Sequence, residues 1–170
     1  MKLIEALKME KRLIERISDL QDKIGEHSAY LDFETPRYEN QKEQVAKWVD
    51  SVRDSLRELE KLRFNILQTN LMTHVTIEIG DSKVTKPIQS WIFRRRELAK
   101  VELNTWLRLT DRNLREGQIQ ESTGNTKSVK IIRCYEPKQK DDMVSVLKEE
   151  PTTIDSALEV VNATTDLIEG

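Results

Sequence analysis

Apolar residues recur at alternating intervals of three and four in two long stretches of the chain, and this spacing places each set along one seam of a helix. The first seam runs through positions 3, 6, 10, 13, 17, 20 and 24, where Glu10 is the one charged residue. The second seam runs through positions 45, 48, 52, 55, 59, 62, 66 and 69. Two such helices joined by a short connection predict a long antiparallel coiled-coil hairpin.

Local signals set the expected bounds of these two helices. Gly25 supplies the left-handed residue found just past many helix ends, so the first helix is predicted over residues 3–24. Thr35 followed by Pro36 predicts the start of the second helix, which is expected to run to Asn70. At about 1.5 Å per residue it would span roughly 50 Å, more than the width of a compact domain of this size. We therefore expect the seams to have too little of their own chain to cover them and to pack on other subunits.

The remaining chain reads as short strands and further helices. Val75, Ile77 and Ile79 alternate with polar residues ahead of a turn at residues 80–82, which predicts a β-hairpin. Pro87 predicts the start of a third helix that continues to about Asp111. The other expected elements are a second β-hairpin over 117–135, a short helix from Pro137 through Leu147, a break at Pro151 and a last helix capped by Thr152 or Thr153.

These elements together predict a mainly α fold, with a long antiparallel coiled-coil hairpin plus a third helix, one or two small β-hairpins and a short C-terminal helix. The 170 residues fit one domain. Residues 1–116 are expected to hold the helical hairpin, the first β-hairpin and the third helix. Residues 117–170 are expected to form an appendage of the same structural unit. With 37% apolar and 34% charged residues, the composition argues against a membrane span.

Charge is distributed unevenly along the chain, although the formal net charge is −2. Residues 1–70 carry 13 basic and 14 acidic side chains, residues 71–135 carry 12 and 7, and residues 136–170 carry 3 and 9. The middle is therefore basic and the tail acidic. This asymmetry can hold the tail on its own body or on a neighbouring subunit.

The single cysteine, Cys134, cannot form an internal disulfide, and its setting reads as a strand with a buried structural thiol. Charges at Lys2, Glu5 and Lys8 interrupt the opening apolar residues before the hydrophobic region of a signal peptide could form. We therefore expect a cytoplasmic protein, or one held in a particle assembled in the cytoplasm.

No motif in the sequence predicts catalysis, a cofactor or a metal. His27 and His74, the two histidines, lie in unrelated segments without a second ligand at motif spacing. The five scattered glycines form neither a P-loop nor a dinucleotide fingerprint. The acidic pairs Asp141-Asp142 and Glu149-Glu150 are interpreted as carboxylates near a helix start and on a solvated face.

One segment carries residues that suit the recognition of a nucleic acid. Arg94, Arg95 and Arg96 are flanked by Trp91, Phe93 and Trp106, and arginine beside aromatics can bind phosphate and stacked bases. Three consecutive helical positions point about 100° apart, however, and cannot form one flat patch. We therefore expect one arginine to reach inward to carboxylates of the long helix or the acidic tail, with the others solvated. The candidate interaction residues are Trp48, Trp91, Arg94, Arg95, Arg96 and Trp106.

Three stretches resemble the septicolysin-like proteins of bacteria, a family of unknown function. They are the opening Met1–Leu7, the segment from Ile66–Asn70 through a hairpin to Arg95–Leu98, and the closing Val161–Leu167. Residues 112–150 look like an insertion. The resemblance implies an α-helical hairpin protein without catalytic residues to carry over, and we interpret its recurring polar positions as helix caps and turn-setters: Thr69, Asn70, Asn162, Thr164 and Thr165. The family name suggests a cytolysin, but the chain shows no amphipathic strand long enough for a pore.

The sequence therefore predicts a non-enzymatic, oligomeric interaction protein that acts through helical packing, with a phage virion or assembly component as one specific form. Its expected partner is another copy of the chain, within a larger assembly, and not a membrane. The first alternative is a nucleic-acid-binding module that uses the basic third helix. The second is a toxin or enzyme with a dispersed site.

Overall fold

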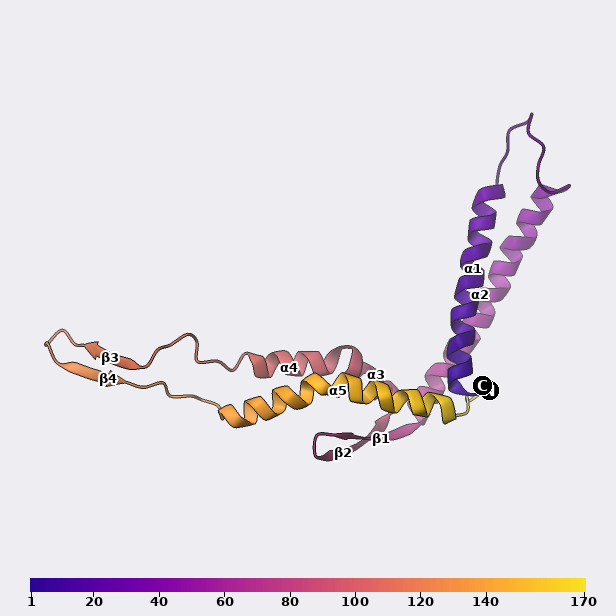
Figure 1. The fold of residues 1–170 in the computed structure, drawn as a ribbon. Coiled ribbons are helices and arrows are strands. Elements are labelled where there is room, and N and C mark those ends of the chain that lie inside the picture. The colour runs from indigo at the N-terminus through magenta and orange to yellow at the C-terminus, as the bar shows by residue number, and fades with distance from the viewer. The chain divides into compact units, whose positions relative to one another are not determined.

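The computed structural model describes every residue from Met1 to Gly170. It confirms the mainly α fold with two small β-hairpins (Figure 1). The elements in chain order are α1 (Leu3–His27), α2 (Gln41–Met72), β1 (His74–Ile79), β2 (Ser82–Pro87), α3 (Ile88–Phe93), the π-helical segment η1 (Arg94–Leu98), α4 (Ala99–Leu107), β3 (Gly117–Gln120), β4 (Thr126–Val129) and α5 (Pro137–Thr164).

The chain divides into two compact units. The first, called the hairpin unit here, contains residues 1–75, 87–89 and 158–170. The second, called the central unit, contains residues 76–86 and 90–157. The sequence predicted a boundary at residue 117. The structure divides the chain differently, because residues 158–170 group with residues 1–75 and not with residues 117–157.

Helices α1 and α2 lie side by side and antiparallel in the hairpin unit (Figure 1). The predicted seams face each other: Leu13 and Ile17 of α1 are buried, as are Leu59 and Leu62 of α2. Glu10, the charged member of the first seam, binds Arg63 of α2 at 2.7 Å. The expectation that these seams lack cover within their own chain is wrong, because each helix covers the seam of the other.

The start of α2 and the end of α1 lie at other residues than the local signals predicted. Helix α2 begins after Asn40, five residues beyond Thr35, because Asn40 Oδ1 accepts a hydrogen bond from the Glu43 amide at 3.2 Å. The Asn40 amide group also donates to the Glu43 carboxylate at 3.0 Å, so the two residues satisfy each other. Helix α1 passes through Gly25 and ends at His27.

The two ends of the chain are hydrogen-bonded to each other. The Leu3 amide donates to the Thr165 carbonyl at 2.9 Å, and the Leu167 amide donates to the Met1 carbonyl at 2.8 Å. Beyond this short antiparallel bridge, the Ile168 amide donates to Thr69 Oγ1 at 2.9 Å. Thr69 is fully buried in α2, so the tail docks on its own chain.

The central unit begins with the β1–β2 hairpin, whose two-residue turn is Gly80-Asp81. Gly80 is the first residue of the turn and has a φ of +59°. Glycine adopts this left-handed conformation readily because it has no side chain. The predicted third helix is then divided into α3, η1 and α4. The Ala99 amide donates to the Arg94 carbonyl five residues earlier, and this wide turn separates the two α-helical pieces.

Strands β3 and β4 form an antiparallel ribbon with Gly117 opposite Val129 and Gln120 opposite Thr126. The ribbon is shorter than predicted, because residues 130–136 have no partner strand. Cys134 therefore lies in an exposed connection, and the prediction of a buried thiol in a strand is wrong.

Helix α5 continues through Pro151, where the sequence predicted a break. A proline in a helix interior removes one backbone hydrogen bond and costs roughly 3 kcal/mol. Leu147 and Glu150 before Pro151 and Ile154 after it are all buried, so one continuous helix keeps them on one face. No helix of the chain combines the length and the apolar character that crossing a bilayer requires.

Candidate functional site

Arg94, the first residue of η1, connects two carboxylates of the central unit. Its Nε donates to Glu150 Oε1 at 2.5 Å and its Nη2 donates to Glu150 Oε2 at 3.1 Å. The same Nη2 also donates to Glu102 of α4. The expectation that one arginine reaches inward to a carboxylate of the acidic tail is thus confirmed for Arg94.

The burial of this ion pair makes it important for the fold. Glu150 is 3% exposed, and a buried carboxylate is tolerated where a cation and hydrogen bonds replace water. The hydrogen bond to Glu150 raises the pKa of Arg94 above its ordinary value, and Glu102 adds to this effect. The guanidinium therefore fixes η1 against α5 through two bonds to one carboxylate, a geometry that lysine could not reproduce.

A pocket of about 520 Å³ opens beside this ion pair. The turn of the β1–β2 hairpin and α5 supply its apolar wall, which includes Ile79, Val146 and Leu147. Lys86 lies over the Trp91 ring, with its ammonium 5.2 Å from the ring centroid, so one wall also carries a cation. The pocket can hold a small molecule with an apolar body and a polar end.

The remaining predicted residues of this segment do not join one surface. Trp91 is buried and lines the pocket with Arg94. Arg95 points to another partner and pairs with Asp155 of α5. Arg96 is exposed, and Trp106 is half-buried on α4. Two of the three arginines are thus paired with carboxylates, which leaves Arg96 as the one of the three that could contact a phosphate backbone.

Trp48 lies in the hairpin unit and serves a structural role. Its ring contacts His27 and Tyr38 edge-on, with centroid distances of 5.5 Å and 5.4 Å. His27 and Tyr38 also meet each other at 5.4 Å. Edge-to-face contacts of this kind stabilise the connection between α1 and α2.

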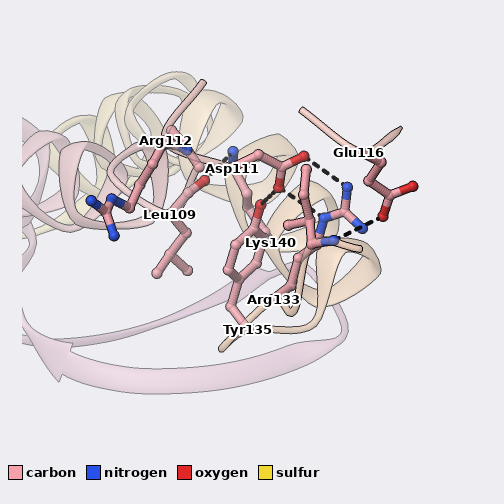
Figure 2. A network of polar contacts seen from close by, with 9 residues as sticks. Leu109, Asp111, Arg112, Glu116, Arg133, Tyr135 and Lys140 are labelled. Atoms are coloured by element: carbon pink, nitrogen blue, oxygen red, sulfur yellow. Dashed lines mark hydrogen bonds and ion pairs between the residues drawn. The ribbon is translucent and has the colours of Figure 1, made fainter. Parts of the chain in front are cut away.

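A second polar cluster holds the base of the β3–β4 ribbon (Figure 2). Asp111 accepts two hydrogen bonds from Arg133, at 2.8 Å and 2.7 Å, and one from the Tyr135 hydroxyl at 3.1 Å. Lys140 of α5 donates to the Leu109 carbonyl at 2.6 Å. Arg133 lowers the pKa of Asp111, while desolvation and then Asp111 raise the pKa of Tyr135. The cluster ties the two ends of the ribbon to the start of α5.

The surface feature that the sequence analysis missed is a second apolar stripe on α2, which we call the outer face. It contains Leu56, Phe64, Leu67 and Leu71, which are 49%, 62%, 46% and 50% exposed. At about 100° per residue, Phe64 lies roughly 150° around the helix from Leu59 and Leu62 of the seam. The spacing of 56, 64, 67 and 71 could have revealed the stripe, but the stronger seam signal dominates the same segment.

Groups of three or more histidine, cysteine, aspartate or glutamate side chains that could hold a metal ion do not occur in the structure. No family model, curated protein or solved structure matches the chain significantly. The septicolysin-like resemblance therefore stays a prediction from the sequence.

Proposed function

We propose that this chain is a non-enzymatic interaction protein that self-associates through the outer face of α2. The observation that carries the proposal is the row of large apolar side chains on this face, which the hairpin unit leaves in water. The seams that the sequence predicted to contact other subunits are buried between α1 and α2. We therefore assign the contact with another subunit to the opposite side of α2.

Exposed apolar area on a helix costs free energy that association recovers. The chain buries 16 hydrophobic residues and exposes 18 large ones. Scattered exposed leucines are ordinary, but Phe64, Leu67 and Leu71 follow one another on one helix face, and such a stripe is typical of an interface. Removing apolar surface from water stabilises a complex by about 25 cal/mol per Å² before the costs of association are subtracted.

Two observations bear on the alternatives. Arg94 and Arg95 are held by carboxylates, which weighs against the nucleic-acid alternative. The pocket beside Arg94 favours a small-ligand site as a second candidate function, because apolar walls and charged groups meet there. Ligand-dependent thermal shifts that Trp91→Ala abolishes, measured across a panel of small carboxylates and amines, would support that candidate.

The exposed thiol supports the compartment that we propose. Cys134 is exposed and free, and an exposed thiol remains reduced most easily in the cytoplasm. This supports our proposal that the protein lies in the cytoplasm, or in a particle assembled there.

The direct test is the mass of the particle in solution. Light scattering behind a size-exclusion column should give a multiple of the 19.9 kDa chain mass for the unaltered chain at micromolar concentration. Phe64→Glu should shift the mass to that of one chain without lowering the helical content, since Phe64 is exposed. The matched control is Ile119→Glu on the exposed strand β3, which should leave the mass unchanged. A monomer at all concentrations for the unaltered chain would overturn the proposal.

A further inference from the structure

We infer that the outer face of α2 binds the outer face of a second copy in an antiparallel pair, with a two-fold axis that passes between Leu56 and Arg57. The inference rests on the proposed function and adds to it the partner surface, the direction and the register. It follows from the order of residues along the exposed face of one helix.

The outer face extends toward the start of α2 through smaller residues. Ala46 is exposed and Val49 is half-buried, and both lie on the same side of α2 as Phe64 and Leu67. At about 100° per residue, positions 46, 49, 53, 56, 57, 60, 64 and 67 all fall within an arc of roughly 100°. The start of the face thus carries the smaller apolar residues Ala46 and Val49, and its end carries the larger Phe64 and Leu67.

An antiparallel pair centred between residues 56 and 57 matches small residues with large ones. Each position then faces the position that adds with it to 113, so that Ala46 faces Leu67 of the other copy and Val49 faces Phe64. Knobs of one helix enter the space that small side chains leave on the other. Because a two-fold interface repeats every contact, both matches occur twice.

The charges of Arg53 and Glu60 agree with the same register. Arg53 faces Glu60 of the other copy, again twice. The exposed ion pairs on α2 join Lys47 to Glu43, Arg53 to Asp50 at 3.5 Å and Arg57 to Asp54, and none of them includes Glu60. The Arg53–Asp50 contact is long and exposed, so Arg53 can turn to Glu60 across the interface at little cost.

A parallel pair lacks both kinds of match. It would place Glu60 on Glu60 and Arg53 on Arg53, and like charges across an interface repel. It would also set Phe64 against Phe64 and Ala46 against Ala46, which leaves a gap at one end and crowding at the other. The order of residues therefore selects the antiparallel direction.

The area is adequate for a stable dimer. The exposed parts of the eight positions from Ala46 to Leu67 offer on the order of 700 Å² per chain, close to the ~800 Å² per partner of a standard interface. The seam with α1 occupies the opposite side of α2, so both contacts form together. The dimer is then a layer of four helices with the two α2 helices in the middle.

Disulfide trapping tests the direction and register. The test variant combines Cys134→Ser, which removes the one native thiol, with Val49→Cys and Phe64→Cys. The two new thiols lie about 22 Å apart in one helix and cannot join within a chain. Mild oxidation should give most of the protein as dimer on a non-reducing gel, because facing positions lie within disulfide reach. Either cysteine alone should give little dimer, and an equimolar mixture of the two single variants should restore it.

The matched control is Val49→Cys with Leu71→Cys. Leu71 lies on the same face and is similarly exposed, but it is seven residues beyond Phe64, about 10 Å along the axis. This pair should not cross-link. Equal trapping of both pairs would overturn the stated register, and efficient trapping by Phe64→Cys alone would overturn the antiparallel direction.

Charge exchange gives an independent measurement. Arg53→Glu should weaken the dimer about tenfold by sedimentation equilibrium, because two attractions become two repulsions. Glu60→Arg should do the same, and the double exchange should restore the dissociation constant to within about twofold. Lys11→Glu, an exposed change on α1, should have no effect.

The outcomes separate this inference from the proposed function. A monomeric unaltered chain overturns both. In another outcome, Phe64→Glu dissociates the dimer but the double charge exchange does not restore its affinity. That result supports the proposed function and overturns this register.

Discussion

Arg94 binds both carboxylate oxygens of Glu150, a residue 56 positions later in the chain, and thereby joins the π-helical turn η1 to α5. The contact is distant in sequence and buried in space. It explains why the first of three consecutive arginines differs from its neighbours.

Breaking this pair from one side should destabilise the protein strongly. Arg94→Met leaves the Glu150 carboxylate buried without its cation, which typically costs about 3–5 kcal/mol. Urea unfolding followed by circular dichroism measures the loss. Arg96→Met is the matched control, because Arg96 is exposed, and it should change the free energy of unfolding by less than about 0.5 kcal/mol. The double variant Arg94→Met/Glu150→Leu should recover much of the loss, and a persistent deficit would contradict this account.

The two faces of α1 should respond differently to truncation. Leu13 is 5% exposed in the seam, so Leu13→Ala should cost about 2–4 kcal/mol through lost burial and a cavity. Ile14, the next residue, points away from α2 and is 43% exposed, so Ile14→Ala should cost well under half as much. Thermal melts of both variants measure the difference, and equal losses would mean that the seam is placed wrongly.

Removing Pro151 should stabilise α5. Pro151→Ala restores an amide that can donate to the Leu147 carbonyl, and the gain should be about 1–2 kcal/mol once the greater freedom of the unfolded chain is subtracted. The measurement is the midpoint of urea unfolding. A loss of stability would show that the proline ring makes a packing contact that outweighs the backbone bond.

The Thr69 hydroxyl should control the closure of the chain ends. Thr69→Val keeps the shape but removes the acceptor for the amide of the half-buried Ile168, at a cost of about 1–3 kcal/mol. Hydrogen exchange should accelerate at the Leu3 and Leu167 amides, which bond across the same closure. Thr105→Val is the control, since that exposed hydroxyl bonds within its own helix. Unchanged exchange at Leu3 would argue against the coupling.

Acid should loosen the base of the β3–β4 ribbon. Arg133 holds the pKa of Asp111 below the ordinary 3.8, so the folded state binds this proton less readily than the unfolded state. The stabilisation is complete above the unfolded pKa and disappears as the pH falls through the lower folded value. Asp111→Asn should therefore flatten the decline of the melting temperature between about pH 5 and pH 2.5. The exposed turn residue Asp81, changed to Asn, should leave that slope unaltered.

Periodicity predicted the parts of the fold that depend on repeated local contacts. Leu59 and Leu62 lie in the seam because a spacing of three and four residues allows one helix face to be buried. The start of α2 was misplaced, because Asn40 and Glu43 satisfy each other's groups better than Thr35 satisfies the first turn. Pro151 was expected to break the helix because of its local backbone cost. Glu150 and Ile154 on either side of it are buried, however, and Glu150 is paired with the distant Arg94.

The candidate sites show the same limit. The sequence indicated that one arginine would turn inward, yet nothing local distinguishes Arg94 from Arg95. The wide turn between Arg94 and Ala99 rotates the residues after it to another side of the helix axis. Such a turn has no simple sequence signature. The spacing of its residues could have revealed the outer face. Its exposure could not be predicted, because it depends on which stripe of α2 packs against α1.

The bonded chain ends also determine how the molecule responds to proteolysis. Residues 1–3 are hydrogen-bonded to residues 165–167, so the backbone is effectively a ring closed by hydrogen bonds. A protease that cuts once in the exposed loop at residues 28–40 opens this ring without releasing a piece. The two fragments should elute together from a sizing column in native buffer and separate in denaturant. Fragments made apart should find each other again and restore the helical signal.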